Sequence, residues 1–91
     1  MSHVFKDKPK LVARIRRIRG QVEAIERALE GEGDCCLDVL QLVASVRGAV
    51  NGLMAELVEG HVGHHVVDAP DQKARQQGAD ELIQILRTYM K

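Results

Sequence analysis

Two kinds of side chain that bind transition metals, a thiol and imidazoles, lie at opposite ends of one predicted helix. Cys36 begins the helical pattern, and His61 and His65 lie near its end, four residues apart and on one helical face. A straight helix rises about 1.5 Å per residue, so Cys36 and His61 of one chain are roughly 37 Å apart. Because no metal ion bridges that distance, a shared site requires two chains, with Cys36 of one antiparallel helix beside His61 and His65 of the other.

Four further residues are candidates to join these ligands. His3 lies in a short N-terminal arm, and removal of the initiator methionine would leave a free amine on Ser2. Cys35 is a second thiol next to Cys36, and His64 is three residues from His61. A mainly imidazole site with one thiolate suits Ni(II), Co(II) or Zn(II), whereas two thiolates would favour Cu(I). The alternative interpretation is that each histidine only caps carbonyls at a helix end.

Cations cluster near the N-terminus and form a second candidate site, this time for an anion. Residues 1–27 contain eight Lys or Arg and three acidic residues, a net charge of +5, whereas residues 28–91 contain five and ten, a net charge of −5. The cations that we predict to bind phosphate on the first helix are Lys10, Arg14, Arg16, Arg17 and Arg19. A solvated helical surface usually alternates in charge, so this cluster favours binding to nucleic acid phosphates.

The composition indicates which nucleic acid this is. With one Phe, one Tyr and no Trp, the chain lacks the aromatic platforms that stack on single strands. We therefore predict double-stranded DNA, bound through its phosphates and its shape. Arg47 lies in the middle of the second predicted helix, where it either extends the basic surface or pairs with an acid inside the protein.

Helical periodicity predicts an all-α protein of three helices. The first runs from about Asp7 to Leu29, with Asp7 as its cap and Pro9 in its first turn. Its apolar residues recur at alternating steps of four and three, which is the spacing of a surface that packs on another helix. These residues are Leu11, Ile15, Ile18, Val22, Ile25 and Leu29.

The second helix runs from Cys36 to about His65, and Asp34 as its cap would place both cysteines in its first turn. A turn over residues 66–70 follows. The third helix covers at least residues 79–90, and Gly78 is either its start or a weak point within it.

The chain of 91 residues is predicted to be one domain, residues 1–91, and its apolar stripes predict an oligomer. It has no run of 18 apolar residues and no signal peptide, so we expect a cytoplasmic protein that does not span a membrane. Two adjacent cysteines are then free thiols. We expect no enzyme, since the sequence contains no phosphate-binding loop, carboxylate pair or dinucleotide motif.

Several stretches resemble the CsoR/RcnR family of small all-helical metal-sensing repressors, over essentially the whole chain. They are residues 14–21, Cys36, residues 46–56, the pair Gly60 and His61, and residues 87–91. The resemblance implies a three-helix protomer that forms an antiparallel dimer, and a homotetramer that is a dimer of dimers. It also implies a repressor that binds operator DNA and releases it when an inducer binds.

The ligand positions resemble one branch of the family more than the others. The copper branch would have a cysteine at the position of His65, whereas the nickel/cobalt branch combines an N-terminal histidine with one cysteine and two histidines. The matching residues here are His3, Cys36, His61 and His65. Alignment through Arg47 selects Cys36 as the ligand, and Cys35 is the alternative thiol. The formaldehyde branch uses an N-terminal proline with the same cysteine, and position 2 here is serine.

The sequence thus leads to the hypothesis of a repressor that releases DNA on binding Ni(II) or Co(II) between subunits. One alternative is a formaldehyde-responsive repressor of the same family, in which Cys36 acts together with the N-terminal amine. The other is a cytosolic metal-binding module that does not bind DNA, which would have no use for the basic helix.

Overall fold

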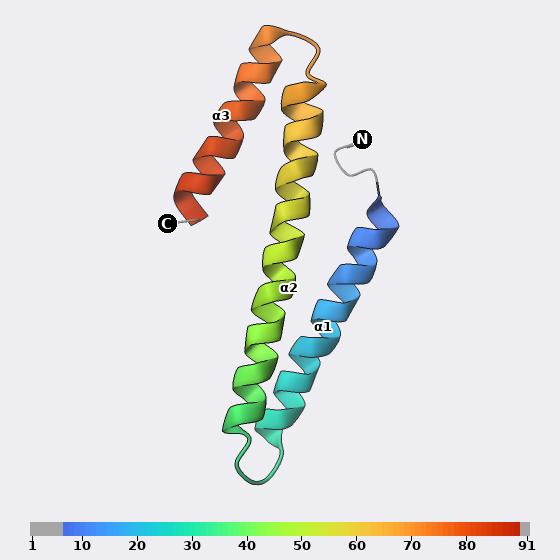
Figure 1. Ribbon diagram of the computed structural model, residues 1–91, viewed down its shortest axis with the longest axis vertical. Helices are drawn as coiled ribbons and strands as arrows, with labels where there is room; N and C mark the ends of the chain where they lie inside the picture. The colour runs from blue at the N-terminus through green and yellow to red at the C-terminus, as the bar shows by residue number, and fades with distance from the viewer. Residues whose placement is uncertain (1–6, 90–91) are drawn as a thin grey trace. The chain divides into compact units, whose positions relative to one another are not determined.

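The computed structural model describes residues 7–89 and contains three α-helices and one π-helix (Figure 1). These are α1 (Lys8–Glu30), α2 (Cys36–Val62), η1 (Gly63–Val67) and α3 (Gln72–Tyr89). No strand occurs within the described residues, which confirms the all-α prediction. The contacts divide these residues into two compact units, 7–54 and 55–89. None of the helices within this range is both long and apolar enough to cross a membrane.

Helix α1 begins where the sequence predicted. The carboxylate of Asp7 accepts a hydrogen bond from the backbone N–H of Lys10 at 3.1 Å, and Pro9 occupies the first turn, where a missing N–H removes no helical bond. The helix ends at Glu30, one residue beyond the prediction. Gly33 in the following loop has a φ of 90°, a conformation that side chains with a Cβ rarely adopt.

Helix α2 begins at Cys36, as predicted, but the residue at its cap position is not Asp34. The carboxylate of Asp34 accepts from the backbone N–H of Cys36 at 3.0 Å, and the carbonyl of Cys35 accepts the first helical bond, from Val39 N–H, at 2.9 Å. Cys35 therefore occupies the cap position, and only Cys36 lies in the first turn. Asp34 makes a local turn with the residue two positions on, a common alternative for aspartate.

The end of α2 differs from the prediction, because the chain continues into η1. The backbone N–H of Asp68 donates to the carbonyl of Gly63 at 3.0 Å, the five-residue step of a π-helix. Val66 and Val67, predicted to lie in a turn, belong to η1, and the turn covers residues 68–71. Apolar periodicity could not distinguish one turn of π-helix from the end of an α-helix.

Helix α3 begins at Gln72, seven residues before the part that the sequence predicted. The carboxylate of Asp71 caps it by accepting from the backbone N–H of Ala74 at 2.8 Å. Gly78, predicted as a start or a weak point, lies inside α3 and is the one buried residue in the described range. A Cβ at Gly78 would lie 2.8 Å from Cβ of His65, so glycine allows α3 to pack directly on the backbone of η1. Met90, the last residue of the predicted helix, lies outside the described residues.

The apolar residues of the helices remain largely uncovered. No hydrophobic residue among those described is buried. On α1, Val22 is 49% exposed and Leu29 is 63% exposed, and on α2, Leu37 is 68% exposed and Leu40 is 61% exposed. These residues belong to the apolar stripes that the sequence assigned to helix packing, so each stripe still offers surface to another helix.

We predict that Gly78→Ala destabilises the protein. Alanine gains up to about 1 kcal/mol of helix propensity over glycine, but its Cβ would overlap the backbone of His65, and overpacking of this kind costs about 1–3 kcal/mol. We expect a free energy of unfolding that is lower by about 1–2 kcal/mol, measured by urea denaturation at a fixed protein concentration.

The control is Gly20→Ala on α1, where an added Cβ meets no other atom within 4 Å. This substitution should leave the stability unchanged or raise it by up to about 1 kcal/mol. A Gly78→Ala protein as stable as Gly20→Ala would contradict the close packing of α3 on η1.

Candidate functional site

Three imidazoles lie together where α2 passes into η1. The ring centroids of His61 and His65 are 4.6 Å apart, and those of His64 and His65 are 4.8 Å apart. All three residues are half-buried. The structure therefore brings together the two histidines predicted as ligands and the third histidine predicted as an additional ligand.

The ring of His61 is oriented by α3. Its Nε2 lies 2.9 Å from the carbonyl oxygen of Gly78, and because a carbonyl only accepts, Nε2 is the nitrogen that donates. In the neutral ring this leaves the lone pair of Nδ1 free to bind a metal. Histidines that bind metals commonly hold their second nitrogen in this way, although the same bond also serves ordinary packing of α3.

The thiols lie at the other end of α2. Cys36, the first residue of the helix, is exposed, Cys35 is half-buried, and both are free thiols. Within residues 7–89, no group of three or more His, Cys, Asp or Glu is arranged to hold a metal ion. His3 and Ser2 fall outside the described residues. In the described part of one chain, the predicted thiol and imidazole ligands thus lie at opposite ends of α2.

Four of the predicted phosphate ligands are exposed along α1: Lys10, Arg16, Arg17 and Arg19. Arg19 lies 4.0 Å from the carboxylate of Glu23, and both side chains are exposed, so this pair holds the guanidinium weakly. Arg47 is exposed on α2 and makes no ion pair with another described residue. These cations are available to a ligand from solution.

Arg14 differs from the other cations of α1 because it is half-buried against α2. A Cβ at Gly52 would lie 2.6 Å from its Nη1, so the guanidinium occupies space that glycine leaves open. A second contact between the same helices joins Gln21 Nε2 to Ser45 Oγ at 2.9 Å. Arg14 therefore contributes to the packing of α1 on α2 as well as to the positive charge.

Two contacts between α3 and the histidine segment were not predicted from the sequence. One is made by Gly78, as described above. The other is made by Arg75, whose Nε donates to the carbonyl of Val66 at 3.1 Å. The sequence does contain a signal for this bond. Pro70 lies four residues after Val66 and has no N–H, so the helical partner of that carbonyl is absent.

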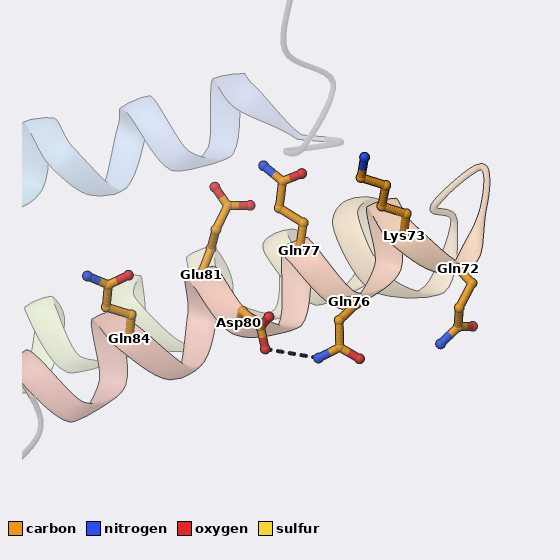
Figure 2. A pocket seen from close by; sticks show the side chains of 7 residues that line it. All are labelled: Gln72, Lys73, Gln76, Gln77, Asp80, Glu81 and Gln84. Atoms are coloured by element: carbon orange, nitrogen blue, oxygen red, sulfur yellow. Dashed lines mark hydrogen bonds between the residues drawn. The ribbon is translucent and has the colours of Figure 1, made fainter.

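A depression of about 670 Å³ lies along α3 (Figure 2). It is lined by Gln72, Lys73, Gln76, Gln77, Asp80, Glu81 and Gln84. Within it, Gln76 Nε2 donates to Asp80 Oδ1 at 3.0 Å. Its lining contains no thiol or imidazole, so the depression offers none of the predicted metal ligands.

Comparisons with known proteins cover almost the whole chain. The sequence model of the family described as metal-sensitive transcriptional repressor matches residues 7–88. Over the full length of both chains, the protein is 56% identical to the "Uncharacterized protein in bioA 5'region" of Serratia marcescens and 43% identical to the transcriptional repressor RcnR of Salmonella typhimurium.

A solved structure agrees with these matches. The chain superposes with a TM-score of 0.83 on a glutamate-to-histidine variant of the formaldehyde-responsive regulator FrmR from Salmonella enterica serovar Typhimurium, at 49% identity. The superposition covers 97% of this chain and 99% of the FrmR chain. The family consists of transcriptional repressors and not of enzymes. The chain belongs to the CsoR/RcnR family of metal-sensitive transcriptional repressors.

Proposed function

We propose that this protein represses transcription by binding operator DNA and releases the DNA when Ni(II) or Co(II) binds between two subunits. The observation that carries the proposal is the orientation of His61. Its Nε2 donates to the carbonyl of Gly78, which leaves Nδ1 for a metal, and the ring of His65 lies 4.6 Å away. The thiol needed to complete the set is at the opposite end of the same continuous helix.

An oligomer would supply what one chain lacks. Residues 7–89 bury no hydrophobic side chain, and the apolar stripes of α1 and α2 are exposed. A chain of 91 residues whose described part buries no apolar core gains stability by association. We infer an antiparallel dimer, in which Cys36 of each chain meets His61 and His65 of the partner chain, and a homotetramer formed by two such dimers.

The donor set fits a borderline divalent metal. One thiolate with two imidazoles, joined by His3 from the N-terminal arm, suits Ni(II) or Co(II) better than Cu(I), and Zn(II) is the next candidate. The amine of Ser2, the thiol of Cys35 and the ring of His64 are further ligand candidates. The 43% identity to RcnR over the full length of both chains supports this choice, together with the resemblance of the ligand positions to the nickel/cobalt branch.

The exposed cations of α1, with Arg14 and Arg47, form the surface that we assign to double-stranded DNA in the cytoplasm. Metal binding releases DNA only if the metal prefers the conformation that does not bind DNA. Ligands on two different chains couple these events, since closing the site fixes two α2 helices relative to each other and thus moves the cations.

Formaldehyde is the second candidate inducer. The similarity to FrmR at 49% identity supports it, and the exposed thiol of Cys36 is accessible to a small electrophile. A reaction of formaldehyde with both this thiol and the N-terminal amine would link the start of α2 to the N-terminus.

The inducer can be identified by measuring operator affinity in a gel-shift titration. Because a cysteine–histidine set favours these metals, we expect Ni(II) or Co(II) to weaken DNA binding at least about 5-fold, within the usual range of coupling between two sites. Mg(II), which prefers oxygen ligands, is the control and should have no effect. If formaldehyde releases the DNA and neither metal does, the metal proposal is wrong.

The site between subunits can be tested with two variants that each lack one half of it. Cys36→Ser should lose the thiolate-to-Co(II) charge-transfer absorption, and His61→Gln should lose most of its Co(II) affinity. After the two proteins are mixed and allowed to exchange subunits, mixed dimers contain one intact site, so part of the absorption should return.

Cys35→Ser is the control for this experiment, and it should keep the charge-transfer band. A band that disappears in Cys35→Ser and persists in Cys36→Ser would assign the ligand to the other thiol. Failure of the mixture to recover any absorption would contradict a site shared between chains.

Arg17→Gln tests the basic surface. Removing an exposed phosphate ligand should weaken binding to all DNA sequences and lower the salt dependence, the slope of log K against log salt concentration, by about 1 for each chain in contact. Arg87→Gln removes the same charge from an exposed position on α3 and should leave the slope unchanged. Equal slopes for both variants and the unmodified protein would exclude Arg17 from the DNA surface.

A further inference from the structure

We propose that Arg75 is a positioning residue for the metal-binding histidines, because its guanidinium holds the backbone that directly follows His65. The inference rests on the proposed metal site and adds a residue that does not itself bind the metal. It starts from the carbonyl of Val66, which accepts from Arg75 Nε at 3.1 Å.

The carbonyl of Val66 needs a partner from outside its own helix. It lies in the last turn of η1, where carbonyls have no donor from their own helix, and Pro70, four residues on, has no N–H to offer. Val66 is half-buried, and a carbonyl removed from water without a partner costs about 1–3 kcal/mol. The guanidinium of Arg75 satisfies it, and a positive charge at the C-terminal end of a helix is favourable in itself.

Arg75 is itself held in place by the first turn of α3. Its Nη1 donates to Gln72 Oε1 at 3.1 Å, and its backbone N–H donates to the carbonyl of Asp71 at 3.0 Å. The carboxylate of Asp71 caps the helix through Ala74. The guanidinium therefore reaches Val66 from a fixed start of α3.

Three contacts between α3 and the histidine segment then act together. Arg75 holds Val66, the backbone of Gly78 packs against His65, and the carbonyl of Gly78 orients the ring of His61. The carbonyl of Val66 belongs to the peptide group between Val66 and Val67, one residue after His65. Losing the Arg75 contact therefore loosens the end of η1, the element that carries the imidazole of His65. The two ligand rings would lose their fixed separation, and binding a metal would then require ordering them.

The experiment compares Arg75→Gln with Lys73→Gln. Both substitutions remove one positive charge from α3, but the Lys73 side chain is exposed and makes no hydrogen bond or ion pair with a described residue. Co(II) affinity, measured by absorption titration of the full-length protein, should fall about 10-fold in Arg75→Gln, as for other residues that support a metal ligand. It should stay within about twofold in Lys73→Gln, and operator affinity of both metal-free proteins should be unchanged.

Amide hydrogen exchange of the metal-free protein gives a readout that does not depend on metal binding. The Asp68 N–H, which donates a hydrogen bond to the carbonyl of Gly63 in η1, should exchange faster in Arg75→Gln. The Val39 N–H, at the start of α2, should exchange at the rate of the unmodified protein. If the unmodified protein binds no Co(II), the proposed function fails, and the exchange rates still decide whether Arg75 holds η1.

Arg75→Lys keeps the charge but replaces the planar group that reaches Val66 and Gln72 together. It should give an intermediate loss of Co(II) affinity, and it takes the place of Arg75→Gln if that protein fails to fold. The inference is overturned if Co(II) affinity is equal in Arg75→Gln and Lys73→Gln, whether or not the exchange of Asp68 changes.

Discussion

The length of one helix constrains the chemistry of this protein. α2 runs without a break from Cys36 to Val62, so the thiol at its start and the imidazoles at its end are separated by roughly 37 Å of helix in one chain. A helix is too stiff to bring its own ends together. A site that used both would have to form by association, and metal binding at the proposed site would then depend on quaternary structure. This is a direct route by which a small ion could change a DNA-binding surface.

The histidine end of α2 is organised by contacts that involve backbone more than side-chain packing. Gly78 contributes a carbonyl to His61 and an open Cα surface to His65, and Arg75 satisfies a carbonyl that Pro70 leaves without a donor. The junction of α2 and η1 brings three imidazoles together, with His61 on α2 and both His64 and His65 on η1. These contacts require particular backbone atoms to meet. They therefore fix the orientation of the histidine rings more strictly than contact between apolar surfaces alone would.

The proposed DNA surface shows a division of roles among similar residues. Lys10, Arg16, Arg17 and Arg19 are exposed, whereas the guanidinium of Arg14 lies in the space left by Gly52. The position of the Arg14 charge therefore depends on how α1 packs on α2. A change in that packing would move this charge relative to the others, which is the kind of local shift that an allosteric repressor needs.

The sequence alone determined the helices, the cap at Asp7, the basic cluster, the family and the separation of thiol from imidazoles, because these follow from periodicity, residue type and the fixed rise of a helix. Tertiary structure decided what depends on close approach. It set Gly78 inside α3, turned Val66 and Val67 into part of a π-helix, moved Asp34 one position before the cap, and gave Arg75 its acceptor. None of these has a periodic signal. The roles of Gly78 and Arg75 result from α3 meeting η1 in space, at distances that sequence spacing does not encode. The π-helix and the Asp34 turn are local hydrogen-bond patterns that apolar spacing does not distinguish from an α-helix and its cap.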